Sequence, residues 1–470
     1  MKHGKIKKRL IFVAFLVLVF TAIFFIVSYT TEKDKREQAL SSMNKKETLI
    51  LWYSDDALTP YLNSKSLAFT EETDIRVETK LVSGLEYLEE INRASISDTE
   101  ETPDMYIVTN DSLEKAYLSG LASELSEVSV VNDETKFNQA AKNSVIYDGK
   151  FVGCPMYFET SALLYNKTYL DQIATVANEE NDTEDEEEQT QTMPIAAQDL
   201  IPESIADIVN FADMYSAPEN VEYFFKWDVS DIFYNYFFIG NYISVGGDAG
   251  DDKSKINIYN PESIASLMVY QELNQFFSID TKETNYDSIM QEFLEGKTIY
   301  TIATSDCIKK LDTAAQNGEF PYEYGVAEVP DINDELKTKG MSVTNALVIN
   351  GYSRHKEAAG SFIDYLINSA SNDLYSMTGK ISAVTQTEYE NEKLAVFMQN
   401  YANSVPMPKM IETSNFWIEL EICFSKVWSG DDANMQIKSL AEKIKTQLAG
   451  EAVSERPLQD PDVELFPTVE

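Results

Sequence analysis

Short apolar runs alternate with polar helical segments in the first part of the chain, and this alternation constrains the fold most strongly. Strand-like runs lie at 48–54, 74–82 and 105–108, and helical patterns follow the last two near 85–95 and 111–119. Strands that alternate with helices at this spacing form a parallel sheet covered by helices. The sequence therefore predicts an α/β fold.

The N-terminus combines a basic cluster with an uncharged apolar run at 10–28. About 20 apolar residues cross a bilayer, and a positive flank stays in the cytoplasm. Secretory signals have shorter apolar runs and end at small residues, whereas a poor cleavage site follows this run. We expect a cytoplasmic segment at 1–9, a single-pass membrane anchor at 10–28, a stalk at 29–47 and an extracellular remainder. A cleaved signal is the alternative.

Composition and motifs exclude several classes of protein. The 470 residues include 78 acidic and 38 basic ones, a net charge of −40, which argues against nucleic-acid binding. The sequence contains no phosphate-binding loop, no dinucleotide fingerprint and no zinc-ligand spacing. The sequence has only two histidines, His3 and His355, so few residues could serve as the histidine of a Ser–His–Asp site. We expect no catalytic residue, no metal and no cofactor, and we expect three buried, unpaired cysteines.

Two acidic segments stand apart from the folded pattern. Residues 179–188 form a run of like charge, which predicts a solvated surface insertion, with cation binding as the alternative. Residues 449–470 are acidic and contain three prolines, which predicts a flexible tail.

Aromatic residues are abundant, with 26 Tyr, 24 Phe and 4 Trp. Their faces stack on the apolar faces of sugars or on cations. Carboxylates accept hydrogen bonds from hydroxyls or pair with ammonium groups. A single tryptophan, however, lies in a core more often than at a ligand. Composition alone therefore leaves the ligand open.

A family resemblance appears at CPMYFETSALLYNK, residues 154–167. With Pro155, Glu159 and the Tyr-Asn-Lys ending, it resembles the first hinge-crossing strand of extracellular solute-binding proteins of the maltose-binding type. Further segments resemble motifs of that family in the same order, from about residue 48 to 448: LILWYSDD, TPDMYIVTND, YDGKFVGCP, FLEGKTIYTIATSD, YEYGVAEVPD and SNFWIEL.

The resemblance implies a two-lobed, periplasmic-binding-protein-like α/β fold with crossing hinge strands and a ligand between the lobes. The first lobe would comprise 48–158 and 341–376, and the second 159–340 and 377–448. The candidate ligand-binding residues are Asp56, Asp111, Glu159, Tyr236, Asp306 and Trp417.

The resemblance also implies capture of an oligosaccharide for an ABC importer, with the permease as partner. The site departs from the family, because Ala57 replaces a basic residue and Asp306 falls near the second tryptophan of the sugar site. Acids without an evident Lys or Arg beside them favour instead a cationic ligand, such as a polyamine or a basic peptide. The sequence also leaves open a sensing domain without transport and an exported hydrolase.

Overall fold

The computed structural model describes residues 47–97, 101–184, 194–369, 372–385 and 387–463. The predicted cytoplasmic segment and anchor, nearly all of the stalk and residues 185–188 of the acidic insertion lie outside these ranges. Residues 179–184 of the insertion, which we expected to form a solvated loop, are helical. Within the described ranges, no helix has both the length and the apolar character that a membrane crossing requires.

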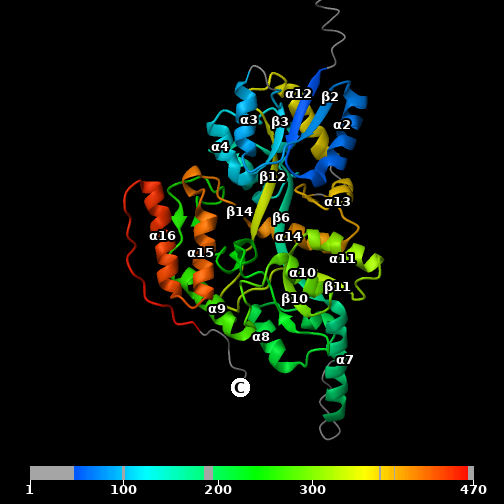
Figure 1. Cartoon of the computed structure of the whole chain (residues 1–470), viewed down its shortest axis with the longest axis vertical. Coiled ribbons are helices and arrows are strands. Elements are labelled where there is room, and N and C mark those ends of the chain that lie inside the picture. The colour runs from blue at the N-terminus through cyan, green and yellow to red at the C-terminus, as the bar shows by residue number, and fades with distance from the viewer. Residues whose placement is uncertain (1–46, 98–100, 185–193, 370–371, 386, 464–470) are drawn as a thin grey trace, which may run out of the picture.

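Helices and strands alternate along most of the chain (Figure 1). The helices are α2 (Thr59–Thr73), α3 (Tyr87–Ile96), α4 (Leu113–Leu118), α5 (Ser129–Asn132), α6 (Gln139–Val145), α7 (Lys167–Glu184), α8 (Ile205–Met214), α9 (Pro261–Phe277), α10 (Tyr286–Leu294), α11 (Asp306–Gln316), α12 (Lys356–Asn368), α13 (Asn372–Thr378), α14 (Glu392–Asn403), α15 (Phe416–Trp428) and α16 (Ala433–Ala449). The strands are β1 (Thr48–Tyr53), β2 (Arg76–Leu81), β3 (Met105–Thr109), β4 (Ile146–Tyr147), β5 (Lys150–Phe151), β6 (Cys154–Asn166), β7 (Tyr223–Phe225), β8 (Ser244–Val245), β9 (Ile256–Asn257), β10 (Thr298–Thr304), β11 (Tyr324–Ala327), β12 (Met341–Ile349), β13 (Ile381–Ser382) and β14 (Val405–Pro406).

The first lobe is built as the sequence predicts. Strand β1 pairs in parallel with both β2 and β3, and α2 and α3 make the connections between them. Apolar side chains such as Leu49 and Leu51 on β1 are fully buried between the sheet and its helices. The predicted parallel α/β arrangement is confirmed here.

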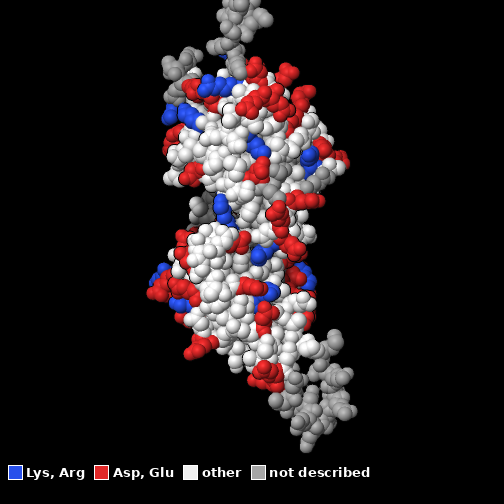
Figure 2. Space-filling model, turned by 90° about the vertical axis from the view of Figure 1, so that its right-hand side faces the viewer, with Lys and Arg blue, Asp and Glu red and all other residues white. Residues whose placement is uncertain are grey.

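Two long antiparallel strands, β6 and β12, join the lobes. Strand β6 pairs with β12 up to Thr160 and with β10 from Ser161 onward, so one strand belongs to both lobes. The shared sheet has ten strands, with β2-β1-β3-β12-β6-β10-β7 as its main path. Figure 1 shows β6 and β12 running between the upper and lower lobes, and Figure 2 shows a narrower waist there. The two-lobe fold is confirmed; the precise lobe boundaries remain a prediction.

The core of the second lobe is rich in aromatic side chains. Helix α15 buries Phe416, Leu420, Phe424 and Val427 on the face that its sequence predicts. Trp428 at its end meets Trp227 edge to face, with ring centroids 5.6 Å apart. The three cysteines are buried and unpaired, as expected.

Part of the C-terminal tail lies against the second lobe. The Leu458 amide donates to the Tyr259 hydroxyl at 2.8 Å, and the Asn434 side chain donates to the Leu458 carbonyl at 3.1 Å. The Glu455 amide donates to the Glu442 carboxylate on α16 at 2.9 Å. Residues 450–463, which we expected to be flexible, are therefore hydrogen-bonded to the domain.

A buried lysine links the two lobes behind the crossing strands. Lys409 is 1 % exposed, and its ammonium donates to the carbonyls of Asn143 and Ile146 at 2.9 Å and to the carbonyl of Ala249. Burial lowers the pKa of Lys409 to about 8, although Asp251 and Glu114 oppose the shift. Three backbone carbonyls thus bind this ammonium, and no carboxylate among the described residues pairs with it.

The lowered pKa of Lys409 should make the stability of the wild type depend on pH, and replacing Lys409 should remove this contribution. Because its pKa is lower in the folded state, the unfolded chain binds more protons at alkaline pH, and stability rises with pH. Between about pH 7.5 and 9.5 the wild type should gain on the order of 1–2 kcal/mol over Lys409→Met. Denaturant unfolding of both proteins across this range measures the difference, and a difference independent of pH would contradict the assignment.

Candidate ligand-binding site

A pocket of about 570 Å³ opens between the lobes beside β6. It is lined by Ala57, Glu159, Asp231, Phe233, Tyr234, Tyr286, Thr304, Ser305, Asp306, Lys309, Thr378, Gly379 and Lys380. Aromatic rings and carboxylates therefore share one pocket. Another pocket, of about 460 Å³, opens beside Thr160 and Ser161, but no aromatic residue lines it. The first has the composition of a ligand site.

Glu159 reaches the pocket because it interrupts a buried strand. Of the 13 residues of β6, only Glu159 and Tyr165 are partly exposed. A lone carboxylate within such an apolar strand is a signal that the sequence itself carries. The strand is also the crossing element, so Glu159 lies where the lobes meet.

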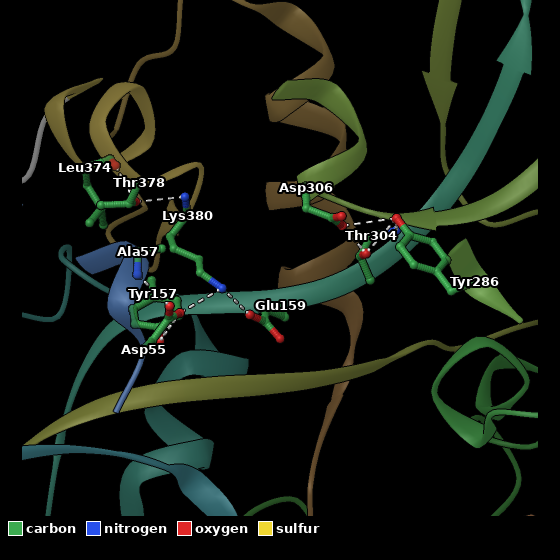
Figure 3. Close-up of polar contacts among 10 residues, drawn as sticks. All are labelled: Asp55, Ala57, Tyr157, Glu159, Tyr286, Thr304, Asp306, Leu374, Thr378 and Lys380. Carbon is green, nitrogen blue, oxygen red and sulfur yellow. Dashed lines mark hydrogen bonds and ion pairs between the residues drawn. The ribbon is translucent and has the colours of Figure 1, made fainter. Parts of the chain in front are cut away.

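Lys380 bridges two acids on this wall, as Figure 3 shows. Its ammonium lies 2.8 Å from the Glu159 Oε1 atom and 3.0 Å from the Asp55 Oδ2 atom. The Tyr157 ring lies beneath the ammonium, with its centroid 5.4 Å away, and its hydroxyl donates to Asp55 at 3.4 Å. Because Lys380 follows α13 and Asp55 precedes the short 3-10 turn Asp56–Leu58, this contact joins distant parts of the chain.

The Lys380 ammonium stays charged over the physiological pH range. Burial alone would lower the pKa of the Lys380 ammonium, but Glu159 and Asp55 outweigh it and raise the pKa above its ordinary value. A cation is therefore already present between the acids. The prediction of a site without Lys or Arg is therefore wrong. The sequence did not reveal Lys380, because 221 positions separate it from Glu159 and no local pattern links them.

The second lobe supplies the opposite wall. Tyr286 donates its hydroxyl hydrogen to the Asp306 Oδ1 atom at 3.1 Å and accepts a hydrogen bond from the Thr304 amide at 3.3 Å. Its ring stacks on Tyr234, with centroids 4.8 Å apart and planes 14° apart. Asp306 thus stands at the start of α11 with one carboxylate oxygen held in place (Figure 3).

The other candidate residues lie outside the lining of this pocket. Asp56 is exposed, whereas its neighbour Asp55 turns inward. Asp111 accepts a hydrogen bond from the Thr109 hydroxyl at 2.5 Å. The Trp417 ring, half-buried at the start of α15, lies 5.5 Å from the buried Tyr236 ring.

This aromatic pair adjoins the pocket along the chain. Tyr234, which lines the pocket, and Tyr236, which contacts Trp417, belong to the consecutive 3-10 turns Ile232–Tyr234 and Tyr236–Phe238. Within the pocket itself, the stacked Tyr234 and Tyr286 rings lie beside the Asp306 carboxylate. Such a surface binds a solute that has both apolar faces and hydrogen-bond donors.

Two lobes joined by crossing strands, with a pocket between them, define a two-lobe solute-binding protein. A model of the family described as bacterial extracellular solute-binding protein matches residues 67–401. The chain belongs to this family, which confirms the resemblance seen in its sequence. Because the family consists of binding proteins, this protein is an extracellular solute-binding protein and not an enzyme.

The chain is also similar to characterised proteins over most of its length. It is 22 % identical over 407 residues to the maltodextrin-binding protein MdxE of Bacillus subtilis, covering 83 % of this chain and 89 % of that protein. It is 24 % identical over 399 residues to a maltooligosaccharide ABC transporter solute-binding lipoprotein of Streptococcus pneumoniae, with coverages of 82 % and 84 %.

Solved structures have the same fold. An extracellular solute-binding protein of Staphylococcus aureus in complex with maltose superposes with a TM-score of 0.69 at 19 % identity, covering 86 % of this chain and 99 % of that one. MalX of Streptococcus pneumoniae in complex with maltopentaose gives a TM-score of 0.60 at 20 % identity, with coverages of 84 % and 99 %.

Proposed function

We propose that the protein captures a neutral oligosaccharide of the maltooligosaccharide class and delivers it to an ABC importer. The observation that carries the proposal is the pocket wall in which Lys380 bridges Glu159 and Asp55. The ammonium offsets one of the two negative charges and holds the Glu159 Oε1 atom, so that the carboxylate is pre-ordered as an acceptor for hydroxyl groups. Tyr234 and Phe233 add apolar area to the lining of the same pocket.

A cationic ligand fits this wall less well. To occupy the position between Glu159 and Asp55, a polyamine would have to displace the Lys380 ammonium and break the two ion pairs that it already makes. A sugar hydroxyl needs no displacement, because ionised carboxylates accept several hydrogen bonds. The relatives that are named for maltodextrin and maltooligosaccharides support the same choice.

Calorimetric titration of the purified protein tests the proposal. Maltose, maltotriose and maltopentaose are one arm, and spermidine at the same concentrations is the other. We expect saturable heat with at least one maltooligosaccharide and much weaker binding of spermidine. Binding of spermidine without any maltooligosaccharide would overturn the proposal.

We also propose that residues 10–28 hold the binding domain at the outer face of the cell membrane. The proposal rests on the length and charge pattern of this run. The mature protein should retain its N-terminus and fractionate with membranes even after washing at high salt. N-terminal sequencing of the mature protein decides this, and a sequence that begins beyond residue 28 would exclude the anchor.

A further inference from the structure

The Asp306 carboxylate has one anchored oxygen and one open one. The Tyr286 and Thr304 hydroxyls both bond to its Oδ1 atom. No hydrogen bond to its Oδ2 atom occurs in the described part of the chain, and Asp306 lines the pocket. A carboxylate fixed in this way presents an oriented acceptor to whatever enters.

Tyr286 is suited to hold that carboxylate still. Its ring is held in the wall by the stack on Tyr234, and its hydroxyl accepts from the Thr304 amide while donating to Asp306. Burial raises the pKa of Tyr286 well above its ordinary value, with Cys307 and Asp306 adding to the shift. The hydroxyl therefore keeps its proton and remains a donor.

Lys309 places a hydrogen-bond donor beside this acceptor. It lies three residues after Asp306 on α11, and residues at this spacing share one face of a helix. Its side chain passes Gly379, where an added Cβ would lie 3.3 Å from the Lys309 Cδ atom. The lining of the pocket thus contains an acceptor, Asp306, and a donor, Lys309, from neighbouring positions on α11.

We propose that Asp306, positioned by Tyr286, and Lys309 together recognise two adjacent hydroxyls of one glycosyl unit from its edge. One hydroxyl donates to the Asp306 Oδ2 atom and its neighbour accepts from Lys309. This inference rests on the proposed sugar-binding function and makes it more specific. At this end of the pocket, the second lobe binds hydroxyl groups of the sugar and does not stack on the sugar ring.

Titration of maltotriose or maltopentaose into four variants tests the inference. Asp306→Asn should weaken binding about tenfold, because hydrogen bonds to a charged acceptor are roughly twice as strong as neutral ones. Tyr286→Phe should weaken binding about fivefold, because the freed carboxylate must be ordered on binding. The double variant should bind no more weakly than Asp306→Asn alone, since Tyr286 acts through Asp306.

Tyr324→Phe is the matched control. The Tyr324 hydroxyl donates to the Oδ1 atom of Asp312, which lies on helix α11 as Asp306 does, at 2.6 Å. Neither Tyr324 nor Asp312 lines the pocket. This variant loses a similar bond and should keep wild-type affinity.

Each outcome bears on a separate claim. If the wild type binds no maltooligosaccharide, the proposed function fails. If the wild type binds and a folded Asp306→Asn variant keeps full affinity, the recognition role of Asp306 is overturned. If the two losses add in the double variant, Tyr286 does not act through Asp306.

Discussion

Trp417→Ala should weaken maltooligosaccharide binding about 10- to 100-fold. The half-buried ring offers a face beside Tyr236, and losing an aromatic contact of this size costs roughly 1.5–3 kcal/mol. Because the ring is partly exposed, the free energy of unfolding should fall by less than the roughly 3–5 kcal/mol that a core tryptophan loses. Calorimetric titration beside denaturant unfolding measures both quantities.

Trp428 on the same helix provides the control. It is 3 % exposed and its indole N–H donates to the Ile279 carbonyl at 3.2 Å, so it belongs to the core. Trp428→Phe should lower stability and leave affinity unchanged. If Trp417→Ala shows this same pattern, its ring is part of the core and not of the binding site.

Lys380→Met should lower the affinity for sugars and raise the affinity for cations. Without the ammonium, Glu159 and Asp55 lose the cation that they share. Sugar affinity should fall about tenfold, because Glu159 is no longer held in place. Spermidine should gain about tenfold, because two unpaired acids attract it. The ratio of the two affinities thus shifts about a hundredfold.

Lys380→Arg keeps the positive charge and should retain most of the preference for sugar. The gain for spermidine in Lys380→Met should shrink as salt is added, because attraction between partly exposed charges is screened. Unchanged affinities for both ligands in a folded Lys380→Met protein would mean that the ligand does not contact this bridge.

The crossing strand was predicted from its resemblance to a family motif, and the structure shows that this motif has a local physical cause. Strand β6 needs an unbroken apolar run to be buried between neighbouring strands, and the single acid within it marks the exposed position. The parallel first lobe was predictable for the same reason, since each strand and helix carries its own periodicity.

The side-chain contacts within the site were not predictable, because they join residues that are distant in the sequence. Asp55 and Asp56 are adjacent acids, and the 3-10 turn gives their side chains different surroundings. Asp55 accepts a hydrogen bond from the Ala57 amide at 3.0 Å and turns inward, whereas Asp56 stays exposed. Lys380 lies in a short link after α13 that has no sequence signature of its own. Their meeting is a property of the tertiary fold.

A crystal structure of the protein with maltotriose or maltopentaose tests the central claim most directly. The account predicts sugar between the lobes, with hydroxyl oxygens about 2.6–3.0 Å from Glu159 and with the Lys380 bridge intact. It also predicts one glycosyl ring against Trp417. Sugar bound outside this pocket, or sugar within it only after the Lys380 bridge has broken, would contradict the account.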